Sequence, residues 1–299
     1  MSILHVLSPS PRPARDAALR RWLARGDRLA DVPGSRDAQV RRLFHFPGGV
    51  LSIAALRHHV HAGDAAVGSW LCADPAYVRG EPTGARLMAC PLPDISRDEA
   101  QALAATLEPL FEDAGSSLAV DSPFAWCAHL GRGSPEVAFT PPAEALGADL
   151  LGCLPAGEAG RRWRQLFSEA QIALHAHPVN AARIAAGKLP VNALWLWGAG
   201  SLPVAVETGL AVVATRDDVI RGLAKVAGVD IAEPSPEAFK GIAGDGLLDV
   251  GTSDGSMEWL PFFEQALGAR RFDAIEVTLP AGERFRVRHA HRLRFWRRG

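Results

Sequence analysis

Strand-like and helix-like segments alternate in the second half of the chain, and this order constrains the fold more than any other feature. The runs at 210–215 and 272–278 are short and apolar, which is typical of buried strands. Residues 217–227 carry apolar side chains at helical spacing, and another helix is expected near 255–267. Strands that alternate with helices predict an α/β fold with a mostly parallel sheet.

The first half of the chain predicts a different mixture of elements. The expected elements are a strand at 3–7, helices at 14–26, 36–44, 50–61 and 96–111, strands at 69–73, 85–90 and 126–130, and a loop with a short strand at 74–79. Ser96 and Glu99 have the spacing of a helix capping box. Gly and Pro are frequent in 131–158, which predicts a linker, and a long helix is expected from 157 to 175.

These patterns predict three segments along the chain. They are an N-terminal strand and helices at 1–67, a small α+β unit at 68–135 and an α/β region at 136–299. A single compact domain is the alternative, because 299 residues suit either one large domain or two modest ones.

Charge and cysteine content narrow the class of protein. The formal net charge is −1, so no general attraction to DNA or to a membrane surface is expected. The longest apolar region, 191–214, is interrupted too often by polar residues, Gly and Pro to span a bilayer. The four cysteines are far apart, without a C-x-x-C pair, which predicts reduced thiols and a cytoplasmic protein.

The stretch from His175 to Gly200 is the strongest candidate for a ligand site. It ends a helix, turns at Gly187 and Pro190 and continues as a strand to a glycine turn. Loops at the ends of strands often bind small molecules, and Arg and Lys can hold an anion there. The residues expected to bind a small anionic ligand are His177, Asn180, Arg183, Lys188, Asn192, Trp197, Gly198 and Gly200.

Each of these residues also has a purely structural interpretation. Asn180 is able to cap a helix, and Asn192 is able to hold a turn. Trp195 and Trp197 alternate along one strand and must share a face, where packing in a core is favoured over stacking on a ligand.

Three motifs in this region resemble the archaeal-type, cofactor-independent phosphoglycerate mutases of the alkaline phosphatase superfamily. They are N-x-x-R at 180–183, G-K-x-P-x-N at 187–192 and W-x-W-G-x-G at 195–200, with weaker similarity at 220–228. The chain resembles more closely a proteobacterial group labelled phosphoglycerate mutase or RpfE-type regulatory protein. The resemblance implies a truncated alkaline phosphatase-like sheet with a small α+β insertion, in which 96–111 belongs to the inserted substrate-side domain.

The same resemblance implies two metal ions, held by Asp and His, and a nucleophilic serine. The first strand instead leads into Ser8 and Ser10, with no acidic residue beside them, and no histidine lies between His177 and His289. Asp245, Asp249 and Asp254 either bind one hard cation or are solvated turn residues, as such acids commonly are. We therefore expect no metal site and no mutase activity, and whether the protein is an enzyme stays open.

Two other groups of residues have the chemistry of a site. His58, His59 and His61 lie on one predicted helix near Asp64, but a solvated helix end is favoured over a metal cluster. Cys127 and His129 share a face if their segment is a strand. A buried structural thiol is favoured there over a nucleophile.

Arginine alternates with apolar residues in the C-terminal segment 284–299, which predicts a strand with one buried face and one basic face. This segment is interpreted as an edge strand protected by charge, a surface for RNA or an acidic protein partner, or a wall for an anionic ligand. The first of these is favoured.

Three functions remain as hypotheses. The leading one is a catalytically incomplete relative of the mutases, without a cofactor, that binds a small anionic or phosphorylated metabolite in a regulatory or accessory role. The second is a divergent metal-dependent phosphotransferase or phosphatase, which would need divalent cations near Asp249 or Asp254. The third is a protein-interaction module that uses 284–299.

Overall fold

Two compact units make up the chain. The computed structural model describes residues 1–8, 17–47, 51–63, 65, 67–82, 84–130, 137–251 and 259–294. Unit 1 comprises 1–48 and 203–299, and unit 2 comprises 49–202. Unit 2 is thus an insertion, and the boundaries differ from the expected ones at 68 and 136. The reason is that the N-terminal strand pairs with two strands from the last third of the chain.

Unit 1 is built on a seven-stranded sheet in the order β2-β12-β11-β1-β10-β8-β9. The strands are β1 (Ile3–Leu7), β2 (Asp27–Leu29), β8 (Leu210–Ala214), β9 (Asp230–Ala232), β10 (Asp245–Asp249), β11 (Ala274–Thr278) and β12 (Arg284–Arg288). The five strands from β11 to β9 are parallel, while β12 is antiparallel to both of its neighbours. The α/β fold with a mostly parallel sheet is confirmed.

Helices complete the core of unit 1. They are α1 (Ala17–Ala24), α2 (Arg36–Arg41), α9 (Asp218–Ala227) and α10 (Leu260–Gly268), with 3-10 turns η2 (Pro236–Phe239) and η4 (His289–Leu293). One face of the sheet packs against α1 and α10, where Trp22 stacks on Phe263. Leu4 and Val6 of β1 point into this core, whereas His5 between them points to the opposite face, as strand alternation requires.

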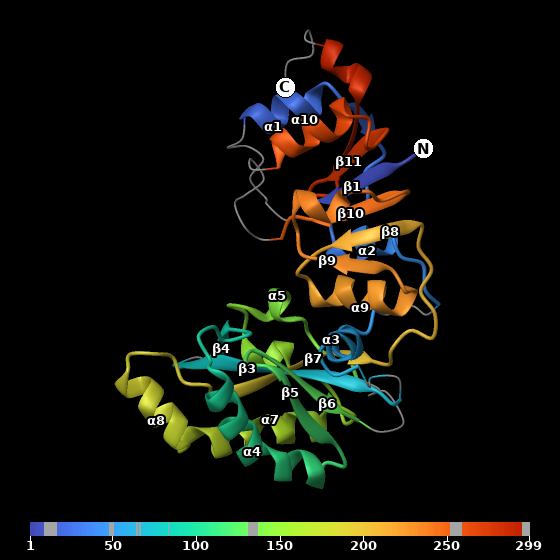
Figure 1. Ribbon diagram of the computed structural model, residues 1–299. Helices are drawn as coiled ribbons and strands as arrows, with labels where there is room; N and C mark the ends of the chain where they lie inside the picture. The colour runs from blue at the N-terminus through green and yellow to red at the C-terminus, as the bar shows by residue number, and fades with distance from the viewer. Residues whose placement is uncertain are drawn as a thin grey trace. The chain divides into compact units, whose positions relative to one another are not determined.

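Unit 2 is an antiparallel five-stranded sheet with helices on both faces (Figure 1). Its strands are β3 (Trp70–Glu81), β4 (Gly84–Ala89), β5 (Ser117–Ser122), β6 (Ala125–His129) and β7 (Ala193–Gly200). The twelve-residue strand β3 pairs with β4, β6 and β7. The short strand expected within 74–79 is part of β3, but the loop expected there is wrong, because Asp74 is buried in β3 and accepts hydrogen bonds from Arg57 of α3.

Six helices lie in the described part of unit 2. They are α3 (Ile53–His61), α4 (Arg97–Asp113), α5 (Pro142–Ala145), α6 (Leu150–Cys153), α7 (Arg161–His175) and α8 (Pro178–Ala185). Helices α4 and α7 pack on one face of the sheet and α3 packs on the other (Figure 1). The capping box of Ser96 and Glu99 at the start of α4 is confirmed.

Several short elements differ from the expectation. The predicted linker 131–158 contains α5 and α6, which join β4 through bridges at Leu87 and Arg86, and its residues 131–136 lie outside the described residues. Helix α8, which the sequence did not predict, starts at Pro178 directly after α7. None of the helices in the described ranges has the length and apolar character that a membrane span requires.

Candidate functional site

Asn180 joins two elements of unit 2 from inside the protein. Its side chain is buried, and its amide nitrogen donates to the carbonyl oxygens of Leu174 and Val191 at 2.8 and 2.7 Å. Its amide oxygen accepts from the backbone nitrogen of Val191 at 2.8 Å. The side chain therefore ties the end of α7 to the approach to β7.

Arg183 and Asn192 have comparable internal contacts. Arg183 is buried and donates to the carbonyl oxygens of Leu189 and Asp94 and to the Glu99 carboxylate at 3.0 Å. Asn192 bonds both backbone groups of Val78, at 2.8 and 2.7 Å, and so acts like an additional strand residue. These atoms satisfy one another within the fold, and anion binding by this group stays a prediction.

The other predicted ligand residues are spread from the start of α8 to the last residue of β7. His177 caps α8 by accepting from the Val179 backbone, and Lys188 is exposed. Gly198 and Gly200, with φ of 64° and 151°, lie at the far end, where a Cβ on Gly200 would lie 2.9 Å from Ser52. Eight strand residues span roughly 26 Å, so the two ends of this set do not converge on one small ligand.

In unit 1, polar groups gather at the carboxyl ends of the parallel strands, where α/β folds commonly place their sites. The Asp249 carboxylate at the end of β10 is 2% exposed, and its Oδ2 accepts from Thr215 Oγ1 at 2.8 Å. The same oxygen lies 2.7 Å from the Arg36 guanidinium, which also contacts Asp217 at 3.2 Å. One arginine therefore serves two carboxylates at this edge.

Asp249 and Asp245 are strand residues, so the interpretation of them as solvated turn acids is wrong. Leu247 and Leu248 between them are fully buried, which places both acids at the ends of a central strand. Asp245 Oδ1 accepts from the backbone nitrogen of Ile3 at 2.7 Å. Asp254 and Ser10 lie outside the described residues, and Ser8 is buried beside Thr278.

A cavity of about 240 Å³ opens in unit 1 between α1, α10 and the segment that follows β12. Trp22, Leu267 and Val287 contribute apolar surface to it, and Glu264 is an acidic residue of its lining. The lining is nevertheless strongly basic. Its basic residues are Arg25, Arg288, His289, His291 and Arg292.

The charges around this cavity are unevenly paired. The Arg288 guanidinium donates to Asp27 at 2.9 Å, and His291 Nε2 lies 3.5 Å from the same carboxylate. The hydrogen bond from Arg294 is the main cause that holds the pKa of the Asp27 carboxyl below its usual range, and the neighbouring His291 and Arg288 act in the same direction. By contrast, neither Arg25 nor Arg292 forms an ion pair with another residue in the described part of the chain.

Strand β12 confirms the expected alternation of arginine and apolar side chains, but it does not lie at the expected position in the sheet. Phe285 and Val287 pack into the core, and Arg284 and Arg286 point to the other face, where both contact the Glu276 carboxylate. The expectation of an edge strand is wrong, because β12 lies between β11 and β2. In this position Arg284 and Arg286 compensate the charge of the buried Glu276. Residues 295–299 of this basic segment are outside the described residues.

The face of the unit 2 sheet that packs against α3 contains a buried ion pair that the sequence did not reveal. Both Arg57 terminal nitrogens donate to Asp74, at 2.9 and 2.8 Å, and Trp197 Nε1 donates to Asp74 Oδ2 at 2.8 Å. Burial opposes the charged form of Arg57, but the neighbouring Cys72 and the Asp74 carboxylate raise its pKa overall. The signal was present as one acidic residue in the apolar run 70–76.

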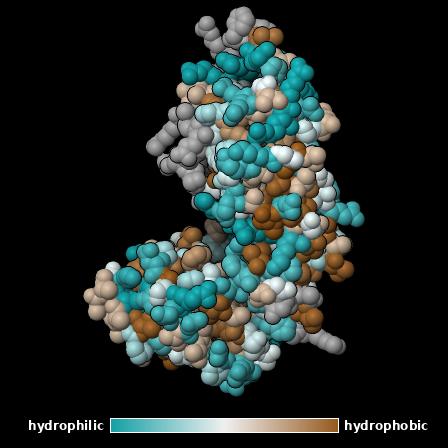
Figure 2. Space-filling model, in the orientation of Figure 1, coloured by the Kyte–Doolittle hydropathy of each residue, from teal (hydrophilic) through white to brown (hydrophobic). Residues whose placement is uncertain are grey.

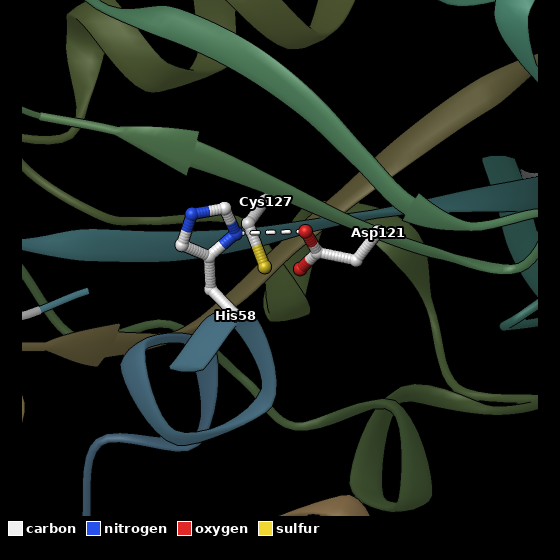
Figure 3. A group of neighbouring side chains, drawn as sticks. All are labelled: His58, Asp121 and Cys127. Atoms are coloured by element: carbon white, nitrogen blue, oxygen red, sulfur yellow. Dashed lines mark hydrogen bonds and ion pairs between the residues drawn. The ribbon is translucent and has the colours of Figure 1, made fainter. Parts of the chain in front are cut away.

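Beside this ion pair, His58, Asp121 and Cys127 come together (Figure 3). The interpretation of His58 as part of a solvated helix end is wrong, because its ring is buried between Trp70 and Asp121. The interpretation of Cys127 as a buried thiol is confirmed. A hydrogen bond with Cys72 and burial raise the pKa of the Cys127 thiol, so it lacks the acidity of a nucleophilic cysteine.

Known proteins resemble part of this chain in sequence. Over 105 residues it is 35% identical to the 2,3-bisphosphoglycerate-independent phosphoglycerate mutase of Methanosarcina barkeri. This alignment covers 33% of this chain and 26% of the relative. The chain is 35% identical over 98 residues to a probable enzyme of that name from Geobacter sulfurreducens, covering 30% and 24%. The chain thus spans about a quarter of the length of the curated relatives it matches. No protein-family model matches the chain.

About a third of the chain is homologous to these mutases. Among solved structures, the PH0037 protein of Pyrococcus horikoshii aligns with a TM-score of 0.53 at 13% identity, over 95% of this chain and 86% of that one. The cofactor-independent phosphoglycerate mutase of Thermoplasma acidophilum aligns with a TM-score of 0.49 at 16% identity, over 96% and 89%. The likeness to PH0037 shows a shared fold.

The mutase family implies two metal ions, and the strand ends of unit 1 do not fit that pair. Two bridging or neighbouring divalent cations need several acidic and imidazole ligands. Of the described carboxylates at this edge, Asp249 and Asp217 already contact Arg36, and Glu233 after β9 contacts Arg216 and Arg221. A guanidinium 2.7 Å from Asp249 supplies locally the positive charge that a metal ion would otherwise supply.

Proposed function

We propose that this mutase-related protein binds a small anionic metabolite, such as a phosphate monoester, and serves a regulatory or accessory role without mutase catalysis. The observation that carries the proposal is the basic cavity of unit 1, in which Arg25 and Arg292 form no ion pair with another described residue. The resemblance to RpfE-type regulatory proteins supports the role.

The chemistry of the cavity matches a small ligand with one charged end. Two guanidinium groups are able to form charge-assisted hydrogen bonds with phosphate or carboxylate oxygens. The Trp22 and Leu267 side chains offer apolar surface to the remainder of the ligand. Hydrophilic side chains are prominent on the visible face of unit 1 near α1 and α10 (Figure 2).

The strand ends of unit 1 support the absence of mutase catalysis in this proposal. Transfer of a phosphoryl group needs concentrated positive charge around the reacting oxygens and a free nucleophile. Arg36 is engaged by Asp217 and Asp249, and the Ser8 side chain is buried. This arrangement is suited to holding the sheet edge together.

Thermal unfolding of the full chain tests the proposal, with 2-phosphoglycerate, 3-phosphoglycerate and inorganic phosphate as the probes. A ligand present at 100 times its Kd adds about 2.7 kcal/mol to the free energy of unfolding. We expect a phosphoglycerate to raise Tm by several degrees, and EDTA to leave that shift unchanged. If none of the probes shifts Tm at millimolar concentration, the proposal is contradicted for this ligand class.

Matched variants locate the site. Arg25→Gln and Arg292→Gln remove the guanidinium groups of the cavity, whereas Lys188→Gln removes an exposed charge of the predicted motif in unit 2. We expect the ligand-induced Tm shift to be lost in the first two variants and kept in the third. Loss in Lys188→Gln alone would instead assign binding to the motif, which supports the function but overturns the cavity as its site.

A divergent metal-dependent phosphotransferase or phosphatase is the second candidate. Two buried oxygens at the strand ends, Asp249 Oδ1 and Thr278 Oγ1, have no hydrogen-bond partner in the described part of the chain, which favours a bound ion or water there. The test is turnover of p-nitrophenyl phosphate with Mg²⁺, Mn²⁺ or Zn²⁺. Metal-dependent turnover that Asp249→Asn abolishes would support this candidate over the first.

A further inference from the structure

A buried cluster on the α3 face of unit 2 contains three different metal-binding side chains. His58 comes from α3, Asp121 from the end of β5 and Cys127 from β6. One ligand atom from each lies within 4.8 Å of the other two. All three side chains are shielded from solvent, at 5% exposure for His58, 3% for Asp121 and complete burial for Cys127.

The hairpin that carries two of these residues is shaped to bring them together. The register between β5 and β6 shifts between Val120 and Ser122, which places Asp121 at a β-bulge. Bulges redirect side chains, and they are frequent beside functional sites. Cys127 pairs directly with Ala119 and with Cys72, on the face that α3 covers.

Figure 3 shows how the three side chains converge. The His58 Nδ1 atom lies 2.7 Å from Asp121 Oδ1, and the Cys127 sulfur lies beside Nδ1. The other ring nitrogen points away from both groups. A Cys-His pair for nucleophilic catalysis would need an acidic, accessible thiol, so this arrangement does not fit a nucleophile.

The geometry points to a binding site for one divalent transition-metal ion, of the Zn²⁺ class, formed by His58 Nδ1, the Asp121 carboxylate and the Cys127 sulfur. Zn²⁺ prefers N, O and S ligands at about 2.0–2.3 Å in a tetrahedral arrangement. Ligand atoms in such a tetrahedron lie about 3.3–3.8 Å apart, so the side chains need to move by only about 1 Å. Three protein ligands leave a fourth position for water or another small ligand.

Charge balance favours a dication at this place. When the metal binds, the Cys127 thiol loses its proton to solvent and the sulfur becomes a thiolate ligand. The thiolate, the Asp121 carboxylate and a neutral His58 then carry a charge of −2, which the metal cancels. The adjacent Arg57 is already neutralised by Asp74, so the metal would complete a neutral buried cluster.

Two further observations support a bound ion. Asp121 Oδ2 is buried and has no hydrogen-bond partner in the described part of the chain. A buried carboxylate oxygen without a partner is costly and calls for an ion or water. In addition, the His58 ring stacks on Trp70, with ring centroids 3.8 Å apart, and this contact fixes the orientation of the ligand nitrogen.

Titration with Co²⁺ tests the site directly. The full chain, free of any affinity tag, is treated with EDTA, desalted and titrated with Co²⁺ while its absorption spectrum is recorded. We expect about one Co²⁺ per chain, a near-ultraviolet thiolate-to-cobalt charge-transfer band and the strong visible bands of a tetrahedral ion. Added Zn²⁺ should abolish all of these bands by displacement.

Variants separate the site from surface binding. Cys127→Ser should lose the charge-transfer band, while Cys153→Ser, at a half-buried cysteine of the same unit, should keep it. Asp121→Asn keeps the shape of the side chain, so it should fold, and it should weaken Zn²⁺ binding by about tenfold or more. The inference is overturned if the wild-type chain binds no Co²⁺, if the band persists in Cys127→Ser, or if Asp121→Asn binds Zn²⁺ with unchanged affinity. It does not depend on the anion site of unit 1.

Discussion

The two units of this protein contain buried charges in two different arrangements. In unit 2, one cation and one anion form a closed pair, because Arg57 contacts Asp74 through two hydrogen bonds. Trp197 Nε1 and the backbone nitrogen of Trp126 also donate to the Asp74 carboxylate. In unit 1, by contrast, the buried Glu276 faces several cations at once.

The cluster of unit 1 has more positive than negative groups. Arg284 and Arg286 donate to Glu276, and Arg42 Nη1 lies 3.5 Å from its carboxylate. His5 also lies between Glu276 and Asp245, at 3.7 and 3.8 Å. Three arginines contact Glu276, and the second carboxylate, Asp245, lies on the other side of His5, so an excess of one positive charge remains even when His5 is neutral. A closed pair depends on both of its members, whereas this cluster contains a histidine, His5, whose protonation adds to the positive charge.

Removing the anion of the closed pair is expected to have the largest effect. Asp74→Asn leaves Arg57 buried without a counter-charge and should lower the free energy of unfolding of unit 2 by about 3–5 kcal/mol. Hydrogen exchange of the β3 and β6 amides measures this, because it reports on unit 2 separately from unit 1.

A double variant distinguishes charge from packing in the same experiment. Arg57→Met with Asp74→Asn removes both charges and should recover part of the lost stability. Recovery should be incomplete, because Trp197 Nε1 loses its charged acceptor. A loss below about 1 kcal/mol for Asp74→Asn alone would contradict the interpretation of a closed buried pair.

The corresponding change in unit 1 should cost less. Glu276→Gln leaves three arginines without their shared partner, but Arg284 and Arg286 are 15% and 27% exposed and stay partly hydrated. We expect a loss of about 1.5–3 kcal/mol, measured by hydrogen exchange of the β11 and β12 amides. Glu283→Gln, at an exposed carboxylate paired with Arg28, is the control and should change these amides little. An equal loss of unfolding free energy in both variants would contradict the expectation that the buried carboxylate contributes more than the exposed one.

The local pattern of the sequence predicted those strands that contain a long apolar run. β1, β8 and β11 lie where they were expected, as do α9 and the capped start of α4. Strand β10 was missed because only two apolar residues separate its acids. Its stability comes from pairing with β1 on one side and β8 on the other, and these contacts connect residues that are far apart in the chain.

The candidate sites were less predictable than the fold. Asp74 was predicted to begin a loop, although a lone acid in an apolar run also indicates a buried partner. That partner, Arg57, lies 17 residues earlier on a helix, and no local spacing connects the two. The cluster of His58, Asp121 and Cys127 likewise depends on how α3 packs on the sheet.

The smallest effect is expected at His5, which should make the stability of unit 1 depend on pH. Burial first, and then the charge of Arg42, lower the pKa of His5 below its ordinary value, although Glu276 and Asp245 oppose this shift. The unfolded chain therefore takes up a proton near pH 6.5, before the folded chain does. The stability contributed by neutral His5 is complete above pH 6.5 and is lost as the pH falls toward the lowered pKa.

Urea unfolding of the wild-type chain and His5→Gln between pH 7.5 and pH 5 measures this contribution. The free energy of unfolding should fall with decreasing pH more steeply in the wild type, because the variant lacks the imidazole that the unfolded chain protonates. His175→Gln, at an exposed position in unit 2, controls for the loss of a histidine. If the free energy of unfolding depends on pH equally in the wild type and in His5→Gln, the predicted lowering of the His5 pKa in the folded chain is contradicted. The Arg57–Asp74 pair and the Glu276 cluster would then differ in how much they stabilise their units, but not in their response to pH.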